Sequence, residues 1–273
     1  MLALKETNPE LAEAVDLHLA LFDLQRRLLP RIPLPVLDLT PEQMATHQAR
    51  GLAVLTFDSI PVEVTDLRLL LRQTADVLHR FGMLEVDDFT RVQALGRDTG
   101  LLAQICDWFG RSVERHAPSS RRAGGTTEEA PETGMLDYVI ALAMKPYLTR
   151  CAEILQPRQE LALWMHGHCA LCGGEPDLAV ITPAAERHLI CGQCSLHWNF
   201  EPLTCPFCGN GSRAKTTSFA TANGHYRVYG CDVCRRYLKA YDARTAPRAV
   251  MPMVDGVATL PLDAAAQQRG YSG

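Results

Sequence analysis

The stretch that decides the fold, residues 169–234, contains four C-x-x-C pairs: Cys169-Ala-Leu-Cys172, Cys191-Gly-Gln-Cys194, Cys205-Pro-Phe-Cys208 and Cys231-Asp-Val-Cys234. These pairs account for eight of the ten cysteines in the chain. A C-x-x-C turn directs two thiolates toward one ion, and two such turns make a tetrahedral site of four sulfur ligands. Paired cysteines in a reducing compartment indicate metal ligands rather than disulfides.

The spacing of the pairs predicts which of them share an ion. Eighteen residues separate the first pair from the second, and twenty-two separate the third from the fourth, which leaves room for a hairpin in each case. Sequential pairing is therefore favoured over an interleaved arrangement, which would need longer closures. Gly173 and Gly209 follow the second cysteine of their pairs, where an open backbone conformation completes the turn.

The cysteines alone do not identify the metal. Sites of four thiolates suit both zinc and iron, and the residues by themselves favour two zinc ions that staple small hairpins over iron. A thiol redox motif is disfavoured, because that chemistry uses one pair in a thioredoxin-like setting. Histidines near the pairs are expected to lie outside the ligand set, because eight thiolates fill two sites; they are His166, His168, His188, His197 and His225.

The region before the cysteines has helical periodicity. Apolar residues recur at helical spacing over 9–28, 64–81, 98–115 and 133–155, and a short helix begins after Thr40. Asn8 and Thr40 are the expected N-caps, and Pro146 is expected to kink the last helix or lie near a break. Residues 117–132 are rich in Pro, Ser, Gly and charge and are expected to form a mobile loop.

Between the cysteine pairs the pattern changes to short β-like runs, at 178–182, 188–190, 216–220 and 226–229. The sequence therefore predicts an α+β protein with an N-terminal all-helical domain followed by two tandem small β modules of the rubredoxin-like or zinc-ribbon type. The expected boundaries are 1–160 for the helical domain, 161–204 for the first metal ribbon and 205–273 for the second ribbon with a C-terminal extension.

Composition limits the function. Of 273 residues, 47% are apolar, which is enough for a sizeable core, and the net charge of −4 argues against a dedicated nucleic-acid binder. No run of 18 apolar residues predicts a membrane span, and residues 1–16 lack the features of a secretory signal, so we expect a cytoplasmic protein. Residues 205–250 nevertheless include eight basic residues and two acidic ones. This basic segment is expected to form either a solvated face or a docking surface.

The remaining candidates have structural interpretations. Trp198 and Phe200 are expected to cover the small ribbons, and Cys106 and Cys151 are expected to be buried small apolar residues. No arrangement of nucleophile, base and acid and no phosphate-binding loop is recognisable, so we do not expect an enzyme.

The cysteine-rich half of the chain resembles the FdhE family of formate dehydrogenase accessory proteins. The resemblance covers Cys169-Ala-Leu-Cys172, Arg187-His-Leu-Ile-Cys191-Gly-Gln-Cys194-Ser-Leu-His-Trp198, Cys205-Pro-Phe-Cys208, Cys231-Asp-Val-Cys234-Arg-Arg-Tyr237-Leu-Lys239, Asp255-Gly-Val-Ala-Thr-Leu-Pro-Leu-Asp263 and Gly270-Tyr271. The chain departs from the family at Asn199-Phe-Glu-Pro202, where a basic residue is usual, and at Asp255-Gly256, where an acidic pair is usual.

The resemblance implies a non-enzymatic maturation factor that is required for active formate dehydrogenase and binds its catalytic subunit. It also implies rubredoxin-like iron at the eight cysteines, two ions per chain, with zinc as the alternative. A ribbon-type nucleic-acid-binding module and a small electron-transfer protein remain the alternative functions. The sequence leaves open which formate dehydrogenase is the client and which oligomeric state the protein adopts.

Overall fold

Helices form the N-terminal part of the protein, as the periodicity predicts. The structure is a computed structural model that describes residues 1–114 and 134–273, so the expected loop at 117–132 lies outside the described residues. In chain order the helices are α1 (Leu2–Thr7), α2 (Ala12–Leu28), α3 (Pro41–Arg50), α4 (Val64–Arg80), α5 (Val86–Leu95), α6 (Leu101–Glu114) and α7 (Met135–Leu155).

Local sequence explains where several of these helices begin and end. The predicted cap Thr40 starts α3 in a capping box with Gln43, and Gly51 ends that helix in the left-handed conformation, φ 63°. Asn8 makes no side-chain cap and instead separates α1 from the turn that precedes α2. The helix α7 continues through Pro146, so of the two predicted alternatives, a kink or a break, the break does not occur.

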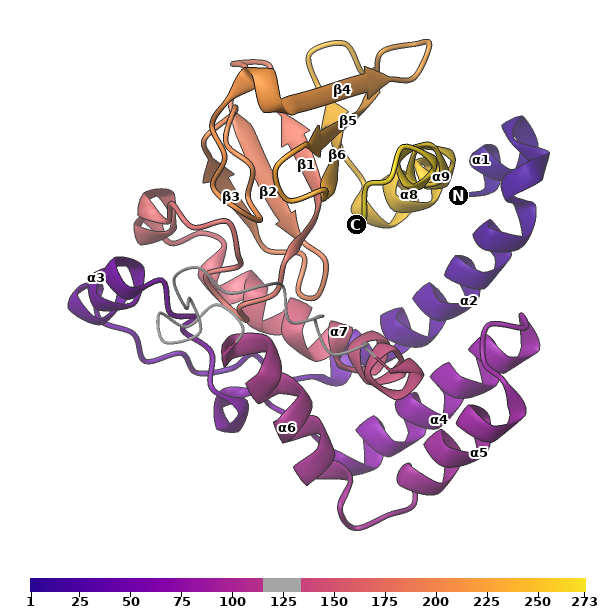
Figure 1. The fold of residues 1–273 in the computed structure, drawn as a ribbon. Coiled ribbons are helices and arrows are strands. Elements are labelled where there is room, and N and C mark those ends of the chain that lie inside the picture. The colour runs from indigo at the N-terminus through magenta and orange to yellow at the C-terminus, as the bar shows by residue number, and fades with distance from the viewer. Residues whose placement is uncertain (115–133) are drawn as a thin grey trace.

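The helices pack around α4, which contacts α2, α5 and α7. Leu67, Leu71 and Leu78 of α4 are fully buried and recur at helical spacing, so one face of α4 lies in the core. Tyr147 and Leu148 of α7 are equally buried in the same core. Figure 1 shows α7 lying between this helical layer and the sheet.

The cysteine-rich part forms one continuous sheet in the order β3-β2-β1-β6-β5-β4. Its strands are β1 (Pro176–Ile181), β2 (Arg187–Cys191), β3 (His197–Phe200), β4 (Thr216–Ala220), β5 (Tyr226–Cys231) and β6 (Tyr237–Asp242). Each module repeats one plan: a cysteine pair, two strands, a second pair and a third strand. The predicted α+β class is thus confirmed, while the domain boundaries stay a prediction.

The two modules are joined through β1 and β6, which pair in parallel from Leu178 opposite Lys239 to Ile181 opposite Asp242. All other strand pairs in the sheet are antiparallel. The first strand of one module therefore meets the third strand of the other, and β3 and β4 become the two edges. The sequence predicts two separate modules, because no local pattern marks the pairing of β1 with β6.

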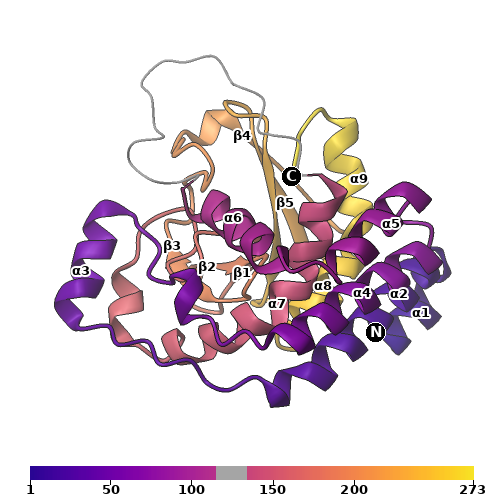
Figure 2. The same ribbon diagram turned by 90° about the horizontal axis from the view of Figure 1, so that it is seen from below.

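Two short C-terminal helices, α8 (Pro252–Ala258) and α9 (Leu260–Gln268), were not expected from the sequence. Figures 1 and 2 show them beside the β4–β6 half of the sheet, close to α1 and α2. Val257 of α8 is buried with Leu11 and Val15, and Leu262 of α9 is buried with Val228 of β5. The extension thus covers the second module and ties it to the N-terminal helices. Among the described helices, none combines the length and apolar character needed to cross a membrane.

Candidate metal centres

The structure gathers the eight paired cysteines into two groups of four, in the predicted sequential pairing. The Sγ atoms within each group all lie within 4.8 Å of one another. Sγ–Sγ distances are 3.5 Å for Cys169–Cys194 and 3.6 Å for Cys172–Cys191. In the second group they are 3.8 Å for Cys205–Cys234 and 3.6 Å for Cys208–Cys231. Four sulfurs at about 2.3 Å from a tetrahedral ion would lie about 3.8 Å apart, so both groups fit such an ion.

All four C-x-x-C turns close in the same way. The residue after each second cysteine has a positive φ: 71° at Gly173, 62° at Ser195, 75° at Gly209 and 59° at Arg235. Its N–H donates to the carbonyl of the first cysteine of the pair, over 2.8–3.1 Å. Glycine was predicted for this conformation at two turns, and at the other two a serine and an arginine adopt it.

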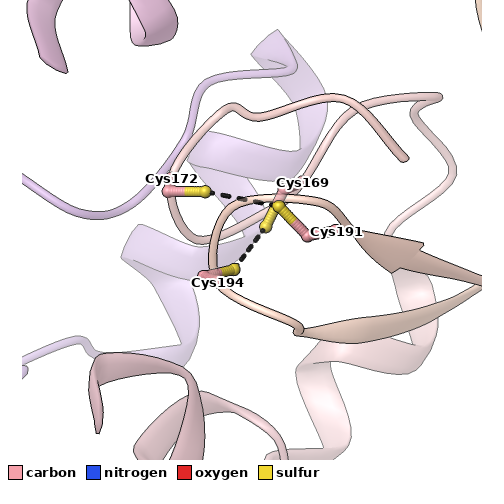
Figure 3. A group of neighbouring side chains, drawn as sticks. All are labelled: Cys169, Cys172, Cys191 and Cys194. Carbon is pink, nitrogen blue, oxygen red and sulfur yellow. Dashed lines mark hydrogen bonds between the residues drawn. The ribbon is translucent and has the colours of Figure 1, made fainter. Parts of the chain in front are cut away.

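The first cluster, Cys169, Cys172, Cys191 and Cys194, is wedged between the sheet and the helices. Figure 3 shows the four sulfurs converging from two turns, and each cysteine is at most 1% exposed. Backbone N–H groups of Val54 and Leu55 donate to the carbonyls of Ala170 and Leu171, at 2.9 Å each. In the facing turn, Lys145 of α7 donates to the carbonyl of Gly192. The helical layer therefore holds both turns of this cluster.

The second cluster, Cys205, Cys208, Cys231 and Cys234, lies at the surface. Cys208 is exposed, Cys205 and Cys234 are half-buried and Cys231 is buried. The guanidinium of Arg236 lies 3.7 Å from the ring centre of Phe207, at the tip of the third turn. That turn is therefore contacted by a side chain that directly precedes β6 of the sheet, whereas both turns of the first cluster are bonded to the helical part.

Thiol ionisation differs within the clusters. Burial raises the pKa of the Cys194 thiol well above its usual value, and burial also raises the pKa of Cys205. At Cys231 burial opposes ionisation, but the backbone N–H groups of Cys234 and Val233 bring its pKa down to about 7. Four thiolates packed this closely repel one another, so a bound cation is what would keep them all ionised.

The other residues singled out in the sequence have structural roles, with one exception. Trp198 and Phe200 are buried as expected, and the indole of Trp198 donates to the carbonyl of His166 at 2.9 Å. No histidine of the described residues joins either cluster. Cys151 is buried as predicted, but Cys106 is exposed, so that prediction was wrong. Cys106 lies on the face of α6 turned away from the buried Ile105, Trp108 and Phe109.

Half of the excess positive charge at 205–250 is neutralised by three acids from elsewhere in the fold, Glu175, Asp255 and Asp263. Six of the eight basic residues form ion pairs. Arg236 binds both carboxylate oxygens of Glu175, at 2.7 and 2.8 Å. Lys239 pairs with Asp263 at 2.8 Å. A linear count of charge could not find these partners, because they lie outside the counted segment.

The C-terminal motif residues also have a packing role. Asp263 accepts a hydrogen bond from Tyr237 as well as pairing with Lys239, which anchors α9 on β6. Asp255 is fully buried, accepts from the hydroxyl of Tyr226 and pairs with Arg248. These contacts explain why the motif accompanies the second module. The contacts that Arg236 and Arg187 make beside the second cluster were not predicted, because no spacing pattern in the sequence marks them.

An FdhE homolog of Haemophilus ducreyi is 29% identical over 135 residues, covering 48% of this chain and 44% of that protein. The FdhE of Escherichia coli is 28% identical over 108 residues, covering 38% and 35%. The chain is a relative of the FdhE proteins. The resemblance seen in its cysteine motifs is thereby confirmed, although the matches span less than half the length of these FdhE sequences. No family model matches the chain.

The fold agrees with a solved structure. The crystal structure of the FdhE protein from Pseudomonas aeruginosa superposes with a TM-score of 0.62 at 19% identity. The match covers 99% of this chain and 89% of that one. Helical and cysteine-rich parts are therefore both shared with an FdhE structure.

Proposed function

We propose that this protein is an accessory factor for the maturation of formate dehydrogenase, which binds the catalytic subunit in the cytoplasm and catalyses no reaction itself. The observation that carries the proposal is the pair of four-cysteine clusters in a chain related to FdhE. The exposed second cluster offers a surface on which a client protein could dock.

Deletion of the gene tests this proposal in a host that makes formate dehydrogenase. Formate-dependent dye reduction should fall to background and return with the wild-type chain. The catalytic subunit should co-purify with the tagged chain, and the purified chain alone should not oxidise formate. A host that keeps full activity, together with no capture of the subunit, would contradict the proposal.

We also propose that the eight cysteines bind two ions per chain, and that the ion is iron. Iron held by four thiolates can be oxidised or reduced by one electron, so it could supply or accept single electrons when bound. Anaerobic purification followed by mass spectrometry should give roughly two irons per chain. A zinc-loaded chain that fully restored the dehydrogenase would exclude a redox role and leave the clusters structural.

One observation favours a second function, electron transfer without a client complex: Cys208 is exposed at the surface. A carrier of this kind would be reduced reversibly by one electron but would form no stable complex with the catalytic subunit. The ion pairs of the basic segment disfavour the nucleic-acid alternative, since six of its eight basic residues are paired with carboxylates; Arg213 and Lys215 form no ion pair within the described structure.

A further inference from the structure

A cleft of about 410 Å³ opens on one face of the sheet beside the second cluster. Its floor crosses the sheet and includes Ala179, Tyr229 and Leu238. Its wall is the segment 202–207, which leads into the third cysteine pair. The cleft thus lies where the two modules meet, and its volume is that of a typical small-ligand or side-chain site.

A buried cation without a carboxylate partner lines this cleft. Arg187 is 5% exposed, and its two terminal nitrogens donate to the carbonyls of Pro202 and Thr204, at 2.9 and 3.0 Å. Its Nε has no hydrogen-bond partner among the described residues. Burying a guanidinium without a bonded carboxylate is costly, and the neighbouring groups Cys205 and Glu201 lessen that cost through their charge without a hydrogen bond to Arg187.

The charge around Arg187 makes the cleft suitable for an anion. Arg213 lines the mouth, is exposed and forms no ion pair within the described structure, while the charge of Arg236 is taken by Glu175. No Asp or Glu is among the lining residues, whereas hydroxyls of Thr216, Ser218 and Tyr229 are. Two cations and several donors therefore face a space whose anionic lining groups are the thiolates of Cys205 and Cys231, which a bound ion would partly neutralise.

Arg187 also has a simpler role, as a staple between β2 and the segment before Cys205. Its two carbonyl contacts and its position over the ring of Phe200, 5.3 Å from the centre, account for such a staple. A staple alone does not explain the unpartnered Nε, the open cleft or Arg213 at the mouth. Those three features are what an acidic group entering the cleft would use.

We propose that the cleft receives an acidic side chain of the docked client, with its carboxylate between Arg187 and Arg213. The occupant is a protein segment rather than a free anion, because exposed apolar side chains accompany the cleft: Leu203 in its lining is 48% exposed, and Val233, two residues after the lining residue Cys231, is 57% exposed. The inference rests on the proposed function and names the surface through which the catalytic subunit binds.

Charge reversal at the mouth tests the proposal without disturbing the staple or the cysteines. With the metal-loaded full chain, Arg213→Glu should weaken binding of the catalytic subunit at least about tenfold. The control Arg97→Glu, at an equally exposed arginine between α5 and α6, should change it by less than about twofold. Interferometry with immobilised subunit measures both, and a photo-crosslinker at position 203 should map to an acidic segment of the subunit.

The outcomes separate the two proposals. Restored binding when Arg213→Glu meets a subunit whose mapped acid is changed to arginine would support the cleft directly. If the wild type binds the subunit, Arg213→Glu binds it equally well and position 203 gives no crosslink, the cleft proposal is overturned but the accessory function is not. A different result would be that inorganic phosphate raises the melting temperature of the wild type but not of Arg213→Glu, while the two proteins bind the subunit with the same affinity. That result would overturn the docking proposal and make the cleft a free-anion site. No binding by the wild type would overturn both proposals.

Discussion

The first and second clusters are each made of four cysteines on two turns of the same conformation, yet their surroundings differ. In the first, all four cysteines are at most 1% exposed and belong to the main hydrophobic core, together with α4 and α7. In the second, Cys208 is exposed, and among the described residues none of its four cysteines is part of that core.

This difference separates two tasks that one ligand set could serve. An ion in the first cluster would join the sheet to the helices, because both turns are bonded to the helical part. An ion in the second would fix a surface loop and remain within reach of solvent and partners. We therefore expect the first cluster to govern stability and the second to govern exchange and docking.

The largest expected effect compares Cys172→Ser with Cys208→Ser. Loss of the buried ligand should remove an ion from the core and lower the unfolding free energy by about 4 kcal/mol or more, because loss of a metal is among the few changes of that size. Melting followed by circular dichroism should show a drop of roughly 10 °C for Cys172→Ser and a clearly smaller one for Cys208→Ser. Equal decreases in melting temperature would contradict the expectation that the first cluster governs stability more than the second.

A second pair of variants leaves every ligand in place and alters the turn tips. Leu171 is fully buried, so Leu171→Ala should cost about 2–4 kcal/mol through the cavity it leaves. Val233 is 57% exposed, so Val233→Ala should change the unfolding free energy by less than about 0.5 kcal/mol. Urea titration of the metal-loaded proteins gives both values, and a large loss at Val233 would show that the fourth turn is more tightly packed than its exposure implies.

Metal release should occur in two phases. When zinc-loaded protein is mixed with a colorimetric chelator, the ion of the second cluster should leave at least about tenfold faster, since a surface site opens without disrupting the core. Cys208→Ser should remove the fast phase alone. A single phase that releases both ions would mean that the clusters open together.

The smallest effect is expected from the contact between the modules. Arg236→Met keeps an apolar stem near Phe207 but removes the bidentate bond to Glu175, so it should speed release from the second cluster by about two- to threefold. Release from the first cluster should not change. Arg97→Met, at an exposed arginine of the helical part, is the control for loss of an arginine, and an equal acceleration there would contradict the role given to Arg236.

Much of the candidate site could be predicted from the sequence, because metal ligation is local. The spacing of the pairs gave the two clusters, and the glycines after Cys172 and Cys208 gave their turn conformation. The start of α3 was equally readable, since Thr40 and Gln43 lie within one turn of each other. Such features depend on residues a few positions apart, which the sequence displays directly.

The features that could not be predicted depend on distant partners. The strand β6 has charged residues at Lys239 and Asp242 but is buried throughout, because Asp263 pairs with Lys239 and Arg244 with Asp242. A polar segment of this kind does not show the pattern of a buried strand until its partners are known. The exposure of Cys106 and the joint between β1 and β6 likewise depend on tertiary packing.

The head-to-tail joint between β1 and β6 also has a consequence for self-assembly. The free edge β3 has the same place in its module as β6, and the free edge β4 has the same place as β1, so copies of the chain could repeat the joint. Such a contact does not close and would grow into a filament. On β3 the side chain of Gln156 accepts from the N–H and donates to the carbonyl of His197, and Pro202 lies two residues after the end of the strand. An edge occupied in this way is a poor template for another strand, which keeps the sheet at six strands.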